Sequence, residues 1–86
     1  MATIGDIKNG LNHGKAEANK AIAQLSGVSG QVDQAIAVLA ALTAGTQQPA
    51  VLSAIGKLNA AKQKFAEGAA AIRSAVDDTD KYNAVL

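Results

Sequence analysis

The chain has 86 residues, with no cysteine, one histidine, one phenylalanine, one tyrosine and a net charge of +1. A single domain of this size has a marginal core, and without cysteine it has neither disulfides nor thiolate zinc sites to stabilise it, so we expect association with another chain. The near-neutral charge and the scarcity of aromatic side chains exclude a basic, base-stacking surface for nucleic acid and a basic surface for anionic membranes.

A long helix is predicted over about residues 4–44. Apolar residues recur there every seven positions in two rows that no charged residue interrupts, as in the a and d rows of a coiled coil. Ile22 and Ile36 lie beside these rows and widen the apolar stripe, which indicates contact with more than one neighbouring helix. Thr3 and Asp6 have the spacing of an N-terminal capping pair. The two rows are Ile4, Leu11, Ala18, Leu25, Val32 and Leu39, and Ile7, Gly14, Ala21, Val28, Ala35 and Leu42.

The segment Ser26-Gly27-Val28-Ser29-Gly30 has the composition of a loop and leaves a three-helix bundle as an alternative. Each glycine inside a helix costs about 1 kcal/mol relative to alanine. The heptad repeat nevertheless passes through this segment without slipping, and three helices of such unequal length would leave the last one overhanging. We therefore favour one continuous or kinked helix.

The connection between the two halves is predicted from glycine and proline. Gly45 is expected to end the first helix in the left-handed conformation. Pro49 is expected to begin the second helix, where its missing N–H costs nothing. The loop then covers about residues 45–48 and the second helix about 49–81, with residues 83–86 frayed.

The second helix repeats the heptad pattern. Lys62 interrupts one of its two rows, and its stem is expected to lie along the seam with the ammonium group in water. The chain is therefore predicted to be all-α, one two-helix antiparallel hairpin over residues 1–86 that forms a coiled-coil-like or four-helix bundle on association. The rows are Val51, Leu58, Phe65 and Ile72, and Ile55, Ala69 and Val76.

No catalytic residue, cofactor site or metal site is predicted. His13 falls at a polar helical position and is interpreted as a solvated side chain. Asp77, Asp78 and Asp80 lack the glycine and closing glutamate of a calcium loop. The serines have no nucleophile elbow around them, and no glycine-rich phosphate loop is present.

No charged residue lies between Gln34 and Gly56, around the predicted loop. Two interpretations of this uncharged tip remain open. Its apolar residues either seal the core of an antiparallel bundle, such as a dimer, or form a docking surface for another protein. The candidate interface residues are Ile36, Leu39, Leu42, Val51, Leu52, Ile55, Leu58 and Phe65.

Two long helices joined by Gly45-Thr46-Gln47-Gln48-Pro49 resemble the W-x-G-type small helical-hairpin proteins of type VII secretion. The chain is still more similar to their divergent Ala-rich relatives in actinobacteria, which carry a similar Gly-x-x-x-Pro turn. The family has a Trp two residues before the loop glycine, where this chain has Thr43. Its export Tyr is followed four residues later by an acid, whereas Tyr82 is followed by Leu86. The resemblance implies a hairpin that pairs into a four-helix bundle as an adaptor, chaperone-like partner or secreted structural piece.

Two functions are compatible with this pattern. The first is a non-catalytic interaction module that associates with itself or with another helical protein. The second is a structural subunit that assembles into a filament or another polymer. We expect no nucleic acid, small-molecule substrate or membrane span. No secretory signal peptide is visible, so a soluble chain is expected in the cytoplasm or exported by a route that reads no such signal.

Overall fold

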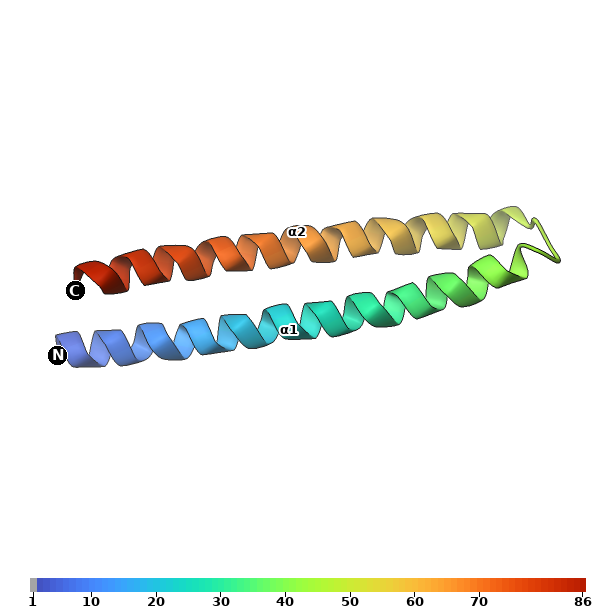
Figure 1. Cartoon of the computed structure of the whole chain (residues 1–86). Coiled ribbons are helices and arrows are strands. Elements are labelled where there is room, and N and C mark those ends of the chain that lie inside the picture. The colour runs from blue at the N-terminus through green and yellow to red at the C-terminus, as the bar shows by residue number, and fades with distance from the viewer. Residues whose placement is uncertain (1) are drawn as a thin grey trace.

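The computed structural model describes residues 2–86 and consists of two long antiparallel helices lying side by side (Figure 1). Helix α1 spans Ile4–Leu42 and helix α2 spans Pro49–Val85. The described residues contain no strand. Both termini lie at one end of the molecule, here called the open end, and the loop lies at the other, the tip. The hairpin measures 64 × 18 × 15 Å, and the predicted all-α helical hairpin is confirmed.

The start of α1 is fixed by a reciprocal cap. The backbone N–H of Asp6 donates to Oγ1 of Thr3 at 3.1 Å, and the N–H of Thr3 donates to Oδ2 of Asp6 at 3.1 Å. These two bonds satisfy backbone donors that have no partner within the helix. From this cap the helix runs without a break through Ser26–Gly30, which excludes the three-helix alternative.

The end of α1 differs from the prediction. The helix stops at Leu42 rather than near residue 44, and the loop covers residues 43–48. Among the described residues no glycine has a positive φ, so the expected left-handed Gly45 is wrong. The hydroxyl of Thr43 instead donates to the carbonyl of Ala40 at 2.6 Å, and the N–H of Gly45 donates to the carbonyl of Leu42 at 3.0 Å. Two local contacts therefore end the helix: the hydroxyl of Thr43 bonds the preceding turn, and the last turn tightens.

Helix α2 begins at Pro49, as predicted, but it continues to Val85, beyond the expected end at residue 81. The expectation of a frayed end over residues 83–86 is also wrong for residues 83–85. Asn83 and Leu86 are half-buried between the helices, and the side-chain amide of Asn83 donates to Oδ1 of Asn12 at 3.5 Å. Contact with α1 therefore extends the helix almost to the end of the chain.

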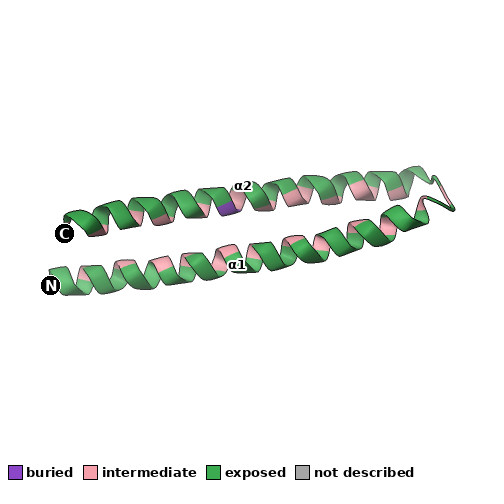
Figure 2. Cartoon of the chain, in the orientation of Figure 1, coloured by how far each residue is buried: buried purple, intermediate pink, exposed green. Residues whose placement is uncertain are grey.

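The half-buried residues lie where the two helices face each other, and they follow a heptad repeat (Figure 2). We call this strip the seam. In α2 both predicted rows are confirmed, and Lys62 lies in the seam as expected. The seam residues of α2 are Val51, Ile55, Leu58, Lys62, Phe65, Ala69, Ile72, Val76, Thr79, Asn83 and Leu86.

In α1 only one of the two predicted rows is right. The row from Leu11 to Leu39 lies in the seam, whereas in the row from Ile7 to Leu42 only Ile7 and Ala21 are half-buried and the other four residues are exposed. The second seam row lies one residue further along the chain and contains Ile22 and Ile36, because burying these two side chains removes more apolar surface from water than burying small residues such as Gly14. The seam residues of α1 are Leu11, Lys15, Ala18, Ile22, Leu25, Ser29, Val32, Ile36, Leu39 and Thr43.

The core within one hairpin is very small. Ala69 is the single residue of the described chain classed as buried, and it remains 9% exposed. The seam is two residues wide, so solvent reaches every other side chain from one side or the other. A pair of helices can cover only one stripe of each partner, and the remaining apolar residues need further protein to cover them.

Candidate interaction surface

The charged groups that cross between the helices lie on one side of the seam. Nζ of Lys15 is 2.8 Å from Oδ1 of Asp80, and Lys62 is paired with Asp33. Both lysines belong to the seam, and both aspartates lie in the rows that flank the seam on one side. The lysine stems therefore cover the seam, and their ammonium groups reach out to that side. We call this the ion-paired side. Its rows are Asn12, Asn19, Ser26, Asp33 and Ala40 in α1, and Leu52, Asn59, Ala66, Arg73 and Asp80 in α2.

The opposite side of the seam carries no charged residue in its two flanking rows, and we call it the uncharged face. Three of its larger side chains are solvent-exposed, with Val28 41%, Leu42 51% and Tyr82 50% exposed, whereas Ile7 is half-buried. A Cβ added to Gly68 would lie 3.9 Å from Cδ1 of Leu25, so α2 approaches the seam of α1 closely on this side. The rows are Ile7, Gly14, Ala21, Val28, Ala35 and Leu42 in α1, and Ala54, Ala61, Gly68, Ala75 and Tyr82 in α2.

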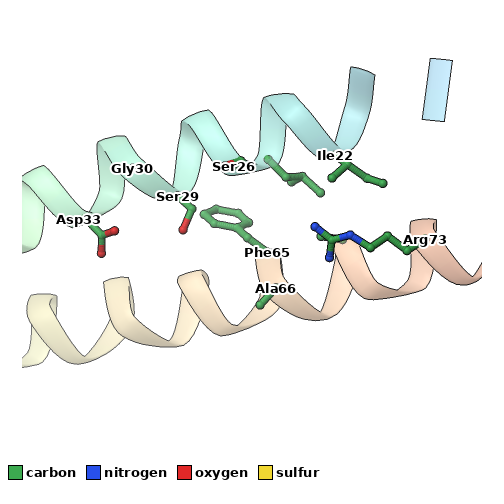
Figure 3. A pocket seen from close by; sticks show the side chains of 10 residues that line it. Ile22, Ser26, Ser29, Gly30, Asp33, Phe65, Ala66 and Arg73 are labelled. Atoms are coloured by element: carbon green, nitrogen blue, oxygen red, sulfur yellow. The ribbon is translucent and has the colours of Figure 1, made fainter. Parts of the chain in front are cut away.

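An open groove runs along the ion-paired side near the middle of the hairpin (Figure 3). The ring of Phe65 reaches from α2 toward α1 beside Ser29, with Asp33 at one end of the groove and Arg73 at the other. The carboxylate of Asp33 is already paired with Lys62. The lining residues are Ile22, Leu25, Ser26, Ser29, Gly30, Asp33, Phe65, Ala66, Ala69 and Arg73.

The serines of this groove are not joined to a general base. Within residues 2–86 neither serine hydroxyl of the groove donates a hydrogen bond to a histidine or a carboxylate, as an activated nucleophile would. His13 is exposed on the outer surface of α1. No group of three or more His, Asp or Glu side chains in the described chain is arranged to hold a metal ion.

The eight candidate interface residues fall into two groups. Leu42 and Leu52 are 51% and 52% exposed, the first on the uncharged face and the second on the ion-paired side. The other six lie half-buried in the seam of the hairpin itself: Ile36, Leu39, Val51, Ile55, Leu58 and Phe65.

Sequence reasoning missed the exposed apolar residues away from the tip, such as Val28 and Tyr82. The signal that could have found them is the charge-free row Ile7 to Leu42, which was assigned to the seam instead of its flank.

By length and composition alone, α1 is also apolar enough to cross a membrane. A helix covered by other helices satisfies the same criterion.

No protein-family model, no curated protein and no solved structure matches the chain. The resemblance to the hairpin proteins of type VII secretion therefore stays a prediction from the sequence. The surface of the hairpin itself is the basis for assigning a function.

Proposed function

We propose that the hairpin is a non-catalytic protein–protein interaction module, which becomes stable by packing its exposed apolar rows against another helical chain. The observation that carries this proposal is the near absence of a core: among residues 2–86 only Ala69 is buried. An isolated pair of helices with so little buried surface gains too little from the hydrophobic effect to offset the entropy of ordering the chain.

The exposed area supports the same proposal. The hairpin exposes 5956 Å², whereas a globular monomer of 8.6 kDa exposes about 4,700 Å². The excess of about 1,250 Å² per chain is more than one partner contributes to a standard-sized protein interface, about 800 Å². A chain of this shape therefore has the surface that an associating protein needs.

The distribution of charge favours closed association over the alternative of a filament subunit. A subunit of an open polymer needs two complementary surfaces whose contact does not form a closed ring or dimer. This hairpin has one uncharged face and one ion-paired side. Adaptor or export-partner activity is the form of association that the resemblance implies, and it requires the same surface.

The test is the mass and helicity of the purified chain in solution. Light scattering across a wide concentration series, combined with far-UV circular dichroism, is expected to give a helical species of fixed mass above 8.6 kDa. A mass that grows without limit would favour the polymer. A fully helical monomer with a cooperative thermal transition at all concentrations would contradict the proposal, because it would show that the hairpin needs no partner.

A further inference from the structure

We propose that the groove on the ion-paired side is a binding site for an aliphatic carboxylate, a free fatty acid of medium chain length. The carboxylate lies against Arg73, and the hydrocarbon chain lies beside Phe65 and Gly30. This site goes beyond the proposed function, and it lies on the opposite side of the seam from the uncharged face.

Arg73 supplies a positive charge that the hairpin does not neutralise. Lys15 and Lys62 are each paired with a carboxylate across the seam. Within residues 2–86, Arg73 makes neither an ion pair nor a side-chain hydrogen bond. The facing helix offers it no partner, because α1 carries no acidic residue between Glu17 and Asp33. The guanidinium therefore keeps its donors available for a ligand.

The guanidinium of Arg73 points into the groove. Figure 3 shows its side chain turned toward Phe65, in the direction of the tip. This direction follows from helix geometry, because long side chains on a helix lean toward its N-terminus. Asp77 lies one turn further toward the open end of the same helix and makes no ion pair with Arg73. The donors of Arg73 are therefore directed at the groove.

The middle of the groove is apolar and open. Ile22 and Leu25 line it from α1, and Phe65 and Ala69 line it from α2. Gly30 completes the wall, and a Cβ added there would meet no neighbouring group within 4 Å. The packing of the hairpin leaves this space unfilled, so a hydrocarbon chain lying in it would remove apolar surface of both partners from water.

The size of the groove suits a small molecule with a linear chain. Its volume is about 390 Å³, and small-molecule sites measure about 300–1,000 Å³. From Lys62 to Arg73 the helix rises about 16 Å, and the guanidinium leans back over part of that length. A carboxylate with an extended chain of medium length, such as decanoate, fits the remainder.

The charges around the groove select an anion with a single negative charge. Asp33 and Lys62 neutralise each other at the end near the tip, so Arg73 leaves one positive charge at the other end. A guanidinium binds a carboxylate through two parallel hydrogen bonds. Because the serines of the groove are not joined to a general base, the molecule is held as a ligand and is not converted.

The first test maps the site with decanoate, added to the isotope-labelled full chain below the concentration at which decanoate forms micelles. The conditions are those in which circular dichroism shows the chain to be helical. Nuclear magnetic resonance is expected to show shifts of the groove amides and of the Nε–H signal of Arg73, while the amide of Val28 on the uncharged face stays unchanged. Shifts spread over the whole hairpin, or no shift at the groove, would overturn the inference.

A charge variant tests the role of Arg73. Arg73→Gln is expected to weaken decanoate binding at least about tenfold, because it removes charge-assisted hydrogen bonds. Lys64→Gln is the control, since it removes an equal charge from a side chain that is 79% exposed and lies outside the groove, and its affinity is expected to match wild type. Decylamine, which has the same chain and the opposite charge, is expected not to bind. Equal binding of decylamine, or equal weakening by both variants, would contradict the carboxylate assignment.

A second matched pair tests the space. Gly30→Phe places a ring in the groove, and Gly27→Phe places the same ring on the exposed surface of α1 outside it. Both variants are expected to fold, because a Cβ added at either glycine meets nothing within 4 Å. Decanoate binding is expected to fall at least about tenfold in Gly30→Phe and to stay at the wild-type level in Gly27→Phe. Unchanged affinity in Gly30→Phe would rule out this groove as the site.

A last comparison separates the free acid from a lipid surface. If the chain binds vesicles of phosphatidylglycerol but not free decanoate, a membrane is the occupant and the inference fails. The mass of the chain in solution is measured separately, so a failure at the groove leaves the proposed interaction module untouched.

Discussion

Replacing Lys62 by leucine should make the hairpin more stable, although it removes an ion pair. The side chain of Lys62 lies in the seam and is 34% exposed, and its partner Asp33 is 55% exposed. A fully buried leucine contributes about 1.5–3 kcal/mol, so a leucine buried to about two thirds contributes about 1–2 kcal/mol. The lost pair between exposed groups contributes about 0–1 kcal/mol. Because the lysine stem already covers part of this apolar surface, the expected net effect of Lys62→Leu is a gain of up to about 1 kcal/mol.

The assay is urea unfolding followed by circular dichroism at one fixed chain concentration, because association and folding are linked. Lys20→Leu is the matched control. Lys20 also makes an ion pair, 3.3 Å from Glu17, but it is 69% exposed and lies outside the seam. The control should lose up to about 0.5 kcal/mol and gain nothing. A Lys62→Leu variant less stable than wild type would refute the reasoning, since it would mean that the ion pair stabilises the seam more than apolar burial does.

Three further predictions follow from the same structure. Phe65→Ala should lower the free energy of unfolding by about 2 kcal/mol, less than full burial would give because the ring is half-buried, and thermal denaturation measures the loss. Thr3→Ala should cost about 1 kcal/mol by removing the reciprocal cap, and amide hydrogen exchange should speed up in the first turn of α1, with unchanged exchange there counting against the cap. His13→Ala should change stability by less than about 0.5 kcal/mol and leave the mass in solution unchanged; a clear change in either would reopen the search for a site at His13.

The second helix was predictable in detail because the size of its side chains leaves one choice of rows. Lys57 and Lys64 occupy the row that begins at Ala50, and the uncharged row that begins at Ala54 has only small side chains before Tyr82, so the large apolar residues of the rows through Leu58 and Ile55 have no competitor. In the first helix two neighbouring rows are both free of acidic residues. The sequence analysis required a row without charged residues, and it therefore selected the row through Gly14 instead of the row through Lys15.

That criterion failed because a lysine can occupy a seam. The stem of Lys15 covers apolar surface while its ammonium reaches Asp80 at 2.8 Å. The partner of a seam lysine lies on the other helix, so the sequence of one helix does not reveal it. The end of α1 was missed for a similar local reason, since the hydroxyl of Thr43 competes for a backbone carbonyl before Gly45 is reached.

The candidate surface was only partly predictable. The uncharged tip drew attention to residues such as Ile36 and Leu58, which the structure places between the two helices of the hairpin. The uncharged face emerges only when the rows of both helices are aligned by their cross-helix contacts. Tyr82, for example, joins it because α2 continues past the expected end and remains in register with α1.

The polarity of the seam changes along its length, and this bears on the order in which the hairpin folds. Near the tip the seam holds apolar residues such as Leu39 and Ile55, while near the open end it holds Lys15, Thr79 and Asn83. The short loop makes the contacts at the tip the least costly in chain entropy. Folding should therefore start at the tip, and the contacts between the two helices should then form progressively toward the termini. Amide protons of α1 and α2 should exchange progressively faster toward the open end, and uniform protection along both helices would contradict this order.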